Sequence, residues 1–395
     1  MTCPLSAVAA GHLCLDILPR LDHLTGGQFD VLFRPGRLIQ VGGARFSTGG
    51  PVSNTGLALH RLGVPTRLIA KVGSDPFGQI VRDLVTQHGA RLADGIALDP
   101  TAPTSYTVII SPPDVDRIFL HCPGTNDTFS CDDVAYDLVA EAALFHFGYP
   151  PIMRRMYTHA GEGLVEVLRR AKATGVTTSL DMTFPDPSSE GGRADWRVIL
   201  KAALPYVDVF LPSLEELLFA LRPATYEQLN ASGALLAQAP ASLLADLGLE
   251  LLDMGVKVAV LKLGHRGLYL RTGGPDRLES LGRARPAGWR QWIDREMWAP
   301  CFQVNVAGTT GSGDATIAGF LAALLRGLSP ERAMTMAVAV GACNVEAADA
   351  LSGLRTWDAT AERVTAGWAR HALSIQAPGW QWDPAGALWL GPGLS

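Results

Sequence analysis

The segment from Gly308 to Asp314, which reads Gly-Thr-Thr-Gly-Ser-Gly-Asp, has residue types and spacing suited to phosphate chemistry. A glycine-rich backbone that enters a helix N-terminus points several N–H groups and the positive end of the helix dipole at one place, where an anion can bind. Asp314 adds a carboxylate that can accept a proton from a hydroxyl beside those N–H groups. Together these features predict phosphoryl transfer to an alcohol.

The alternative explanation of this segment is a plain helix cap after a glycine turn. Two other anion-binding motifs do not fit. A P-loop requires a Gly-Lys-Ser/Thr sequence, which does not follow here, and a Rossmann turn requires the order Gly-x-Gly-x-x-Gly, which the segment lacks. The missing Rossmann turn also argues against a nicotinamide-dependent oxidoreductase.

A second polar group lies near the N-terminus. Gly49 and Gly50 precede a helical stretch that contains Asn54 and ends at Gly63. Two glycines allow a ligand to approach the backbone closely, and an Asn in the first turns of a helix offers both an acceptor and donors to a polyol. Asp16, which follows an apolar run, is a further candidate. A plain turn and cap, and a turn residue at a strand end, are the alternatives for these positions.

The elements that must position these residues are short apolar runs that alternate with longer stretches of helical periodicity. This alternation predicts a doubly wound α/β fold, in which a mostly parallel sheet carries helices on both faces and binds ligands at the carboxyl ends of its strands. Asp16, Asp181 and the Gly308–Asp314 loop each follow an expected strand. The expected strands are Arg67–Val72, Ala143–Phe147, Thr177–Leu180, Val207–Leu211, Val258–Leu263 and Phe302–Val306. The expected helices are Val52–Leu62, Phe77–His88, Tyr157–Ala173, Arg193–Ala203, Ala315–Arg326 and Pro330–Ala348.

Three segments depart from this alternation. Tyr106–Ser111 and Arg117–His121, separated by Pro112-Pro-Asp, predict a β-hairpin outside the main sheet that can cover the site as a lid. Arg222–Leu249 is rich in Ala and Leu and is expected to be helical. Thr272–Glu296 is rich in Gly, Pro, Arg and Trp and is expected to be a long loop.

Composition favours a small-molecule partner. The chain of 395 residues carries a formal charge of −5, so neither nucleic acid nor a membrane is expected as a partner. The six cysteines are scattered, which favours neither a zinc site nor a disulfide framework. No signal peptide pattern and no apolar run of about 18 residues is present, so a cytoplasmic protein is expected.

Four segments, taken in order, resemble the characteristic blocks of the ribokinase/PfkB family of carbohydrate kinases. They are Gly49–Gly63, Lys71–Gly78, Arg117–Gly124 and Gly308–Phe320. The resemblance implies a ribokinase-like α/β domain over residues 1–375, with a small β-sheet lid formed by residues of about 17–48 and 104–121, followed by a C-terminal tail at 376–395. It implies an ATP-dependent sugar kinase that uses Mg²⁺ and forms a homodimer through the lid.

The resemblance also assigns roles to individual residues. Asp314 is implied as the general base, and three residues that precede it, Gly311, Ser312 and Gly313, as the anion hole. The residues implied to bind sugar hydroxyls are Asp16, Gly49, Gly50 and Asn54. The residues implied to contact the nucleotide are Lys262, Gly264 and Gly267, and Glu216 is implied to orient hydrated Mg²⁺.

Two alternatives of function stay open beside the sugar kinase. A nucleoside kinase of the same family needs an aromatic platform for a base, which Tyr106 and Phe119 in the lid can supply. A catalytically silent sugar-binding sensor is suggested by Gly308, Ser213 and Thr183, which differ from the usual family residues. Asp314 argues against the sensor, because a binding module has no need of a carboxylate beside an anion hole. The identity of the sugar does not follow from the sequence.

Overall fold

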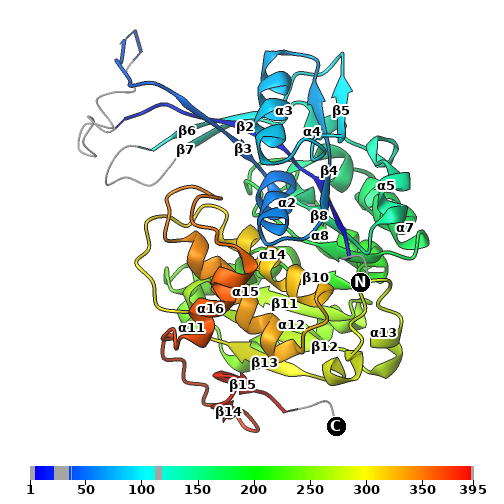
Figure 1. Ribbon diagram of the computed structural model, residues 1–395, viewed down its shortest axis with the longest axis vertical. Coiled ribbons are helices and arrows are strands. Elements are labelled where there is room, and N and C mark those ends of the chain that lie inside the picture. The colour runs from blue at the N-terminus through cyan, green and yellow to red at the C-terminus, as the bar shows by residue number, and fades with distance from the viewer. Residues whose placement is uncertain (1–4, 22–34, 37, 112–117, 393–395) are drawn as a thin grey trace.

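The computed structural model describes residues 5–21, 35–36, 38–111 and 118–392. These residues form a body around a large twisted sheet and an arm that projects from one end of it (Figure 1). In the described part of the chain the large sheet has 11 strands in the order β14-β15-β13-β12-β11-β10-β9-β8-β1-β4-β5. The strands from β11 to β5 are parallel to their neighbours, whereas β12, β13, β15 and β14 pair in antiparallel fashion.

The strands of the large sheet have these bounds: β1 Ala7–Gly11, β4 Thr66–Gly73, β5 Gly95–Asp99, β8 Leu144–Gly148, β9 Thr177–Leu180, β10 Val209–Phe210, β11 Val258–Lys262, β12 Leu268–Thr272, β13 Glu296–Ala299, β14 Gln381–Asp383 and β15 Leu388–Leu390. Every residue of β1 and β8 is buried. Alternate side chains of β8 face opposite sides, since Phe145 and Phe147 belong to one apolar core cluster and Leu144 to another. Cover on both faces therefore explains why these strands are continuously buried.

The expected helices are present with shifted ends. They are α2 Pro51–Arg61, α3 Pro76–His88, α7 Glu162–Ala173, α8 Trp196–Ala203, α14 Ser312–Leu325 and α15 Pro330–Asn344. The helix expected from Tyr157 begins only at Glu162, because His159 and Ala160 have positive φ angles that interrupt the helical path. The stretch expected to be helical from Arg222 contains three helices, α10 Pro223–Asn230, α11 Leu235–Gln238 and α12 Ala241–Asp253.

Two expectations for the C-terminal half were wrong. Phe302–Val306 is not a strand: it makes one isolated bridge, from Phe302 to Arg370, and Val306 is 62% exposed. Its alternating pattern reflects extended chain that passes outside the sheet. Thr272–Glu296 is not simply a loop, because it begins at the end of β12, contains α13 Pro275–Glu279 and ends at the start of β13. Where a tail was expected, at residues 376–395, the chain adds β14 and β15 to the large sheet.

The arm is a separate four-stranded sheet in the order β3-β2-β6-β7, at the upper left of Figure 1. Its strands are β2 Cys14–Leu18, β3 Arg45–Gly49, β6 Tyr106–Ile110 and β7 Ile118–Cys122. The predicted hairpin is confirmed, since β6 and β7 pair in antiparallel fashion, and its Pro112–Asp114 turn lies outside the described residues. Asp16 was wrongly placed at the end of a core strand, because it lies in the middle of β2 in the arm.

Candidate active site

Asp314 lies at the centre of a site formed where α2, α14 and the end of β8 meet. It is the third residue of α14, which follows the N-cap residue Gly311, and it is 3% exposed. Three side chains donate hydrogen bonds to its carboxylate: Asn54 Nδ2 and Tyr149 OH to Oδ2, both at 3.0 Å, and Thr55 Oγ1 to Oδ1 at 3.1 Å. The carboxylate is therefore held in one orientation from three directions.

The electrostatic surroundings of Asp314 suit a group that takes up a proton. Burial raises the pKa of Asp314 above its usual range, and the nearby Lys262 charge and the three hydrogen bonds only partly oppose this. A carboxyl whose pKa is raised by burial is a stronger base than an exposed one. Asp314 is thus a candidate general base on geometry and on charge.

Backbone N–H groups and one ammonium group gather beside Asp314. The first N–H groups of a helix have no acceptor within it, and in α14 these belong to the predicted anion-hole residues Ser312 and Gly313 and to Asp314. A Cβ atom added to Gly313 would lie 3.6 Å from Lys262 Nζ, so the ammonium group lies close to this helix end. Gly311 has a φ of 71°, which favours glycine, and a Cβ there would lie 2.6 Å from Ala350 Cβ. These N–H groups and the ammonium group of Lys262 are together suited to binding an anion.

Lys262 is held in place by a buried carboxylate. It ends β11 and donates a hydrogen bond of 2.6 Å to Oδ1 of Asp181, which follows β9 and is 1% exposed. Burial would lower the pKa of Lys262, but the charges of Asp181 and Glu216 outweigh it and raise this pKa. The lysine is therefore positively charged.

Glu216 lies near this group but has a structural partner. Ser213 Oγ accepts from the backbone N–H of Glu216 at 3.2 Å, and Glu216 Oε2 accepts from the N–H of Ser213 at 2.6 Å, which forms a capping box at the start of α9 Leu214–Leu221. Among the residues that the structure describes, no group of three metal-ligating side chains is present. One carboxylate suits Mg²⁺ only if water molecules supply most of the ligands.

A cavity of about 480 Å³ extends from this polar group to an apolar end. Gly264 and Gly267, which were expected to contact a nucleotide, line it and flank the short turn after β11. A Cβ atom on Gly267 would lie 1.9 Å from the carbonyl oxygen of Ala299, so only glycine fits there. Val304, Val338 and Ala342 line the apolar end. Phosphates at the polar end and a flat ring at the apolar end would match this lining.

The predicted sugar-binding residues are brought together on the other side of Asp314. A Cβ atom on Gly49 would lie 2.5 Å from Oδ2 of Asp16, so the two residues are in direct contact across β2 and β3. Gly50 has a φ of 92° and accepts a backbone hydrogen bond of 2.8 Å from Asn54, which contacts Asp314. Burial raises the pKa of Asp16 to about 6, against the opposing hydrogen bonds from Cys14 and Thr107.

The structure adds residues that sequence reasoning missed. Thr55 follows the predicted Asn54 directly, and Tyr149 comes from a left-handed turn after β8, with a φ of 65°. His12 is 3% exposed, and neither of its ring nitrogens has a hydrogen-bond partner in the described part of the chain. Its ring centroid lies 6.2 Å from that of Tyr149 and 5.4 Å from that of His121 on the arm. The signal that was available is the position of His12 directly after β1.

His12 is uncharged in this environment. Burial, reinforced by the nearby His121 ring, lowers the pKa of His12 to about 3. A neutral imidazole has one donor and one acceptor nitrogen, and a buried polar atom without a partner is costly. Both nitrogens of His12 are therefore suited to bind hydroxyl groups of a ligand.

No helix in the described ranges is long and apolar enough to cross a membrane. Comparison with known proteins places these observations in a family. The family described as pfkB family carbohydrate kinase matches residues 23–357.

Among curated proteins, a probable chloroplastic fructokinase of Arabidopsis thaliana is 26% identical over 329 residues, which cover 80% of this chain and 74% of that protein. An ATP-dependent ribose-1-phosphate kinase of Halopiger xanaduensis is 25% identical over 335 residues, covering 85% and 90% of the two chains.

Solved structures share the fold. A fructokinase of Xylella fastidiosa with bound ATP has a TM-score of 0.66 at 20% identity and covers 91% of this chain and 98% of its own. A ribokinase of Thermotoga maritima has a TM-score of 0.64 at 18% identity, with coverage of 91% and 99%. The expected ribokinase-like fold, a large, mostly parallel sheet with a separate small sheet, is confirmed by these similarities.

Proposed function

The chain belongs to the pfkB family of carbohydrate kinases, phosphotransferases with an alcohol group as acceptor, and we propose that it transfers the γ-phosphoryl group of ATP to a hydroxyl of a sugar or sugar-like polyol, with Asp314 as general base. The observation that carries the proposal is the position of a buried carboxylate, fixed by Asn54, Thr55 and Tyr149, beside the first N–H groups of α14. Of these, the N–H of Ser312 also donates to the carbonyl oxygen of Thr309 at 3.2 Å. This arrangement unites proton acceptance and anion binding at one point.

In the proposed reaction, Asp314 accepts the proton of the attacking hydroxyl as the new bond to phosphorus forms. The N–H groups of Ser312 and Gly313 and the ammonium group of Lys262 stabilise the negative charge that the transferring group carries. Asn54 and Tyr149 keep the carboxylate aimed at the hydroxyl, because their hydrogen bonds fix Oδ2. Positioning and electrostatics thus account for the catalysis.

The donor side of the site fits ATP. Its cavity of about 480 Å³ joins a cationic end, at Lys262 and the helix N-terminus, to an apolar end suited to an adenine ring. Gly264 and Gly267 line this cavity and place the backbone of the turn after β11 against it. Mg²⁺, when bound, would balance phosphate charge, and Glu216 is the residue that would hold it, through water molecules and through the carboxylate oxygen that the capping box does not use.

The acceptor side is assigned to Asp16, Gly49, Gly50 and Asn54, with His12 as an added contact. Asp16 presents carboxylate oxygens, whereas neutral His12 presents a donor and an acceptor, so the three polar side chains suit a ligand with several neighbouring hydroxyls. The glycines allow Asp16 and His12 to lie directly against the backbone, because a Cβ atom would be 2.5 Å from Asp16 Oδ2 at Gly49 and 2.6 Å from His12 Nδ1 at Gly50.

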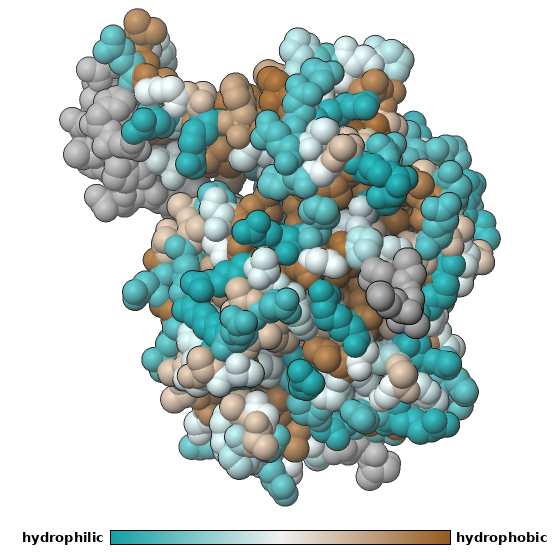
Figure 2. Space-filling view, in the orientation of Figure 1, coloured by the Kyte–Doolittle hydropathy of each residue, from teal (hydrophilic) through white to brown (hydrophobic). Residues whose placement is uncertain are grey.

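The arm is proposed as a lid that closes over the acceptor. It carries apolar side chains that lack cover: the exposed fractions are 45% for Phe46, 39% for Ile118, 55% for Phe119 and 54% for Leu120. Brown surface lies along the projecting arm in Figure 2, beside the atoms drawn in grey. Contact with a second lid would bury these side chains, which supports a homodimer. Exclusion of water by the closed lid would protect the phosphoryl group from hydrolysis.

The two alternatives are less well supported. A nucleoside base needs an aromatic platform, but the Tyr106 ring already packs edge-on against Phe77 at a centroid distance of 5.4 Å. A silent sensor would not need the buried carboxylate of Asp314, and the Ser213 change that suggested it is explained by the capping box.

An ADP-release assay over pentoses, hexoses, sugar acids and nucleosides tests the proposal. We expect turnover with a polyol acceptor and ATP, and a loss of at least about 10²-fold in kcat for Asp314→Asn, because the amide cannot accept the proton. Thr365→Ser, at the exposed end of α16 Trp357–Thr365, is the control and should keep full activity. Unchanged turnover of Asp314→Asn on the best acceptor would remove Asp314 as the base.

A further inference from the structure

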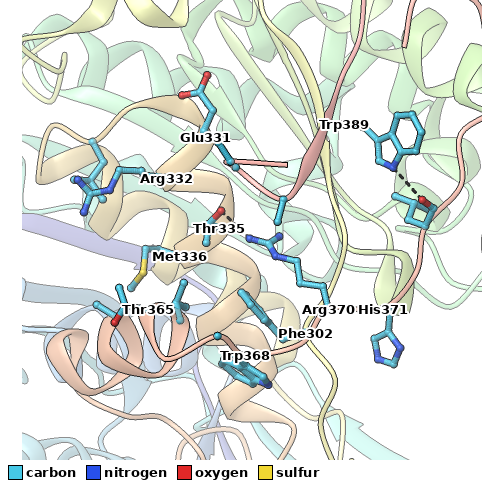
Figure 3. A pocket seen from close by; sticks show the side chains of 18 of the residues that line it. Phe302, Glu331, Arg332, Thr335, Met336, Thr365, Trp368, Arg370, His371 and Trp389 are labelled. Carbon is cyan, nitrogen blue, oxygen red and sulfur yellow. Dashed lines mark hydrogen bonds between the residues drawn. The ribbon is translucent and has the colours of Figure 1, made fainter. Parts of the chain in front are cut away.

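A second cavity, distinct from the one that Asp314 lines, lies between α15, α16 and the last strands of the sheet (Figure 3). Its volume of about 750 Å³ is within the range of small-molecule sites. Its lining is rich in aromatic side chains: Phe302, Trp357, Trp368, Trp382 and Trp389. Phe302 and Trp368 stack at a centroid distance of 4.5 Å, and Trp382 is 44% exposed. The proposed kinase reaction uses none of these rings.

Arg370 is the main polar group of this cavity. Figure 3 shows its side chain reaching from the segment after α16 toward Thr335 on α15. It donates hydrogen bonds to Thr335 Oγ1 at 2.8 Å and to the carbonyl oxygen of Pro300 at 3.1 Å, and its guanidinium carbon lies 4.4 Å from the centre of the Phe302 ring. A guanidinium has about five N–H donors. Those that remain have no acceptor among the described residues.

The positive charge of Arg370 also lacks a counterion. No acidic side chain in the described part of the chain forms an ion pair with it. Burial lowers the pKa of Arg370 to about 10, which still leaves the group charged at neutral pH. A partly buried charge without a partner is costly, so a partner anion would stabilise the protein in this state.

The other charged groups of the lining add to this positive charge. The side chain of Arg332 lines the same cavity and makes no hydrogen bond or ion pair with any residue that the structure describes. Glu331 is the acidic residue of the described lining, and its carboxylate is already paired with Arg295 at 2.5 Å. The cavity therefore combines unpaired positive charge with aromatic walls.

We propose that this cavity is a binding site for a small molecule that carries a planar aromatic ring and one anionic group, a carboxylate or a phosphate. The anionic group binds the unused N–H donors of Arg370, and the ring packs against the tryptophan side chains. Guanidinium groups bind both kinds of anion through paired N–H donors, and indole rings offer large flat surfaces to an aromatic ligand. Phe302 and His371 line both cavities, so the ligand would lie behind a wall of the nucleotide cavity.

Calorimetric titration of the whole protein tests this site. Indole-3-acetate and phenyl phosphate are the two anionic probes, and neutral indole-3-acetamide is the matched control. We expect at least one anion to bind about tenfold more tightly than the amide, on the scale of a charge-assisted hydrogen bond, and to do so equally well when ATP saturates the protein. The preferred probe identifies the anion as carboxylate or phosphate. Equal binding of anions and amide, binding of neither anion, or displacement by ATP would overturn the proposal.

Variants locate the site. Arg370→Gln should weaken the binding of the preferred anionic probe at least about tenfold. Arg363→Gln is the matched control, because Arg363 stacks 3.6 Å from the centre of the Trp368 ring but is paired with Glu346 and does not line the cavity. Thr365→Trp fills the cavity from its exposed rim, keeps Arg370 intact and should also abolish binding, so a folding defect of Arg370→Gln does not leave the site untested. Equal effects of Arg370→Gln and Arg363→Gln, or normal binding by Thr365→Trp, would contradict the assignment.

Discussion

The two sides of Asp314 are built in different ways. On the proposed acceptor side, polar side chains would determine what can bind. Asp16 and His12 lie on or beside strands, and the glycines next to them have no room for a Cβ atom. Such an atom would lie 2.5 Å from Asp16 Oδ2 at Gly49 and 2.6 Å from His12 Nδ1 at Gly50. On the proposed donor side, backbone N–H groups and Lys262 make the site, and two of its glycines pack tightly against other parts of the protein. A Cβ atom would lie 2.6 Å from Ala350 Cβ at Gly311 and 1.9 Å from the carbonyl oxygen of Ala299 at Gly267.

This difference indicates which residues would determine the choice of alcohol and which would determine the use of ATP. Backbone N–H groups recognise any phosphate, so the donor side can be generic and still work. Side chains in fixed positions recognise a particular pattern of hydroxyls, because a buried polar group left without a partner is penalised. We therefore expect substitutions on the acceptor side to change which alcohol is used, and substitutions on the donor side to change the use of ATP.

The largest effect is expected for Lys262→Met. Loss of the ammonium group beside Gly313 removes charge stabilisation, and we expect kcat/KM for ATP to fall about 10²-fold, with little change in KM for the acceptor. Steady-state kinetics with each substrate varied in turn measures this. Lys257→Met is the control, since Lys257 forms a similar ion pair with Asp208 at 2.7 Å, at the opposite end of the sheet. A larger change in KM for the acceptor than in kcat/KM for ATP would contradict the assignment of Lys262 to the donor side.

His12→Leu should show the opposite pattern. It removes two ring nitrogens that have no partner among the described residues, so no hydrogen bond of the described structure is lost, whereas the acceptor loses contacts worth about tenfold in KM. KM for ATP should stay within experimental error. His60→Leu, on the surface of α2, serves as control. An unchanged acceptor KM in His12→Leu would show that His12 faces no ligand.

The pH dependence of acceptor binding should be smaller and have a definite sign. Because the pKa of Asp16 is raised to about 6, its carboxylate becomes protonated as the pH falls through that value, and acceptor KM should rise several-fold while KM for ATP stays level. Asp16→Asn should flatten the profile. A profile that keeps its step in Asp16→Asn would assign the titration to another group.

The raised pKa of Asp16 has the opposite pH dependence in its effect on stability: it favours the folded state at low pH and not at high pH. A carboxyl with a raised folded-state pKa contributes stability that is fully present below its unfolded pKa of about 3.9 and is lost as the pH rises through about 6. Relative to wild type, Asp16→Asn should therefore be more stable at pH 8 than at pH 4 in denaturant titrations. If the stability difference between Asp16→Asn and wild type is the same at pH 4 and at pH 8, the pKa of Asp16 is not raised.

The smallest effect is expected in the dynamics of the lid. Amide exchange in residues 104–111 and 118–121 should slow a few-fold when the acceptor is added, because a small sheet with exposed apolar side chains opens readily. ATP alone should have less effect, and β11 in the core should change little with either ligand. Equal slowing by ATP and by acceptor would show that the lid belongs to both sides of the site.

Local pattern was enough to predict most of the fold. The parallel strands β1, β4 and β8 are short runs made mainly of apolar residues, and α2, α14 and α15 have clear start signals, so their existence followed from the sequence. The antiparallel strands were harder, because β12 to β15 include polar and aromatic residues and pair over long distances in the chain. Phe302–Val306 has the alternation of a strand but finds no partner beyond a single bridge.

The site was predictable where its residues lie in motifs. Asn54 and Asp314, 260 residues apart in sequence, are joined by a hydrogen bond, and the sequence had marked both. Tyr149 could not be found in this way, because its role depends on a left-handed turn after β8 that brings its hydroxyl to a carboxylate 165 residues away. His12 is similar, since what marks it is the absence of partners for its nitrogens, which only three-dimensional packing reveals.

The pairing of β15 with β13 has a consequence for the synthesis of the chain. During translation, β13 leaves the ribosome long before β15, so the edge of the sheet at Met297 and Trp298 stays open while α14, α15 and α16 are made. Open strand edges with apolar side chains readily pair with other chains. Chaperones that bind this edge would therefore reduce aggregation of the newly made enzyme. Faster translation from β13 to Trp389 would have the same effect, because it shortens the time during which the edge is open.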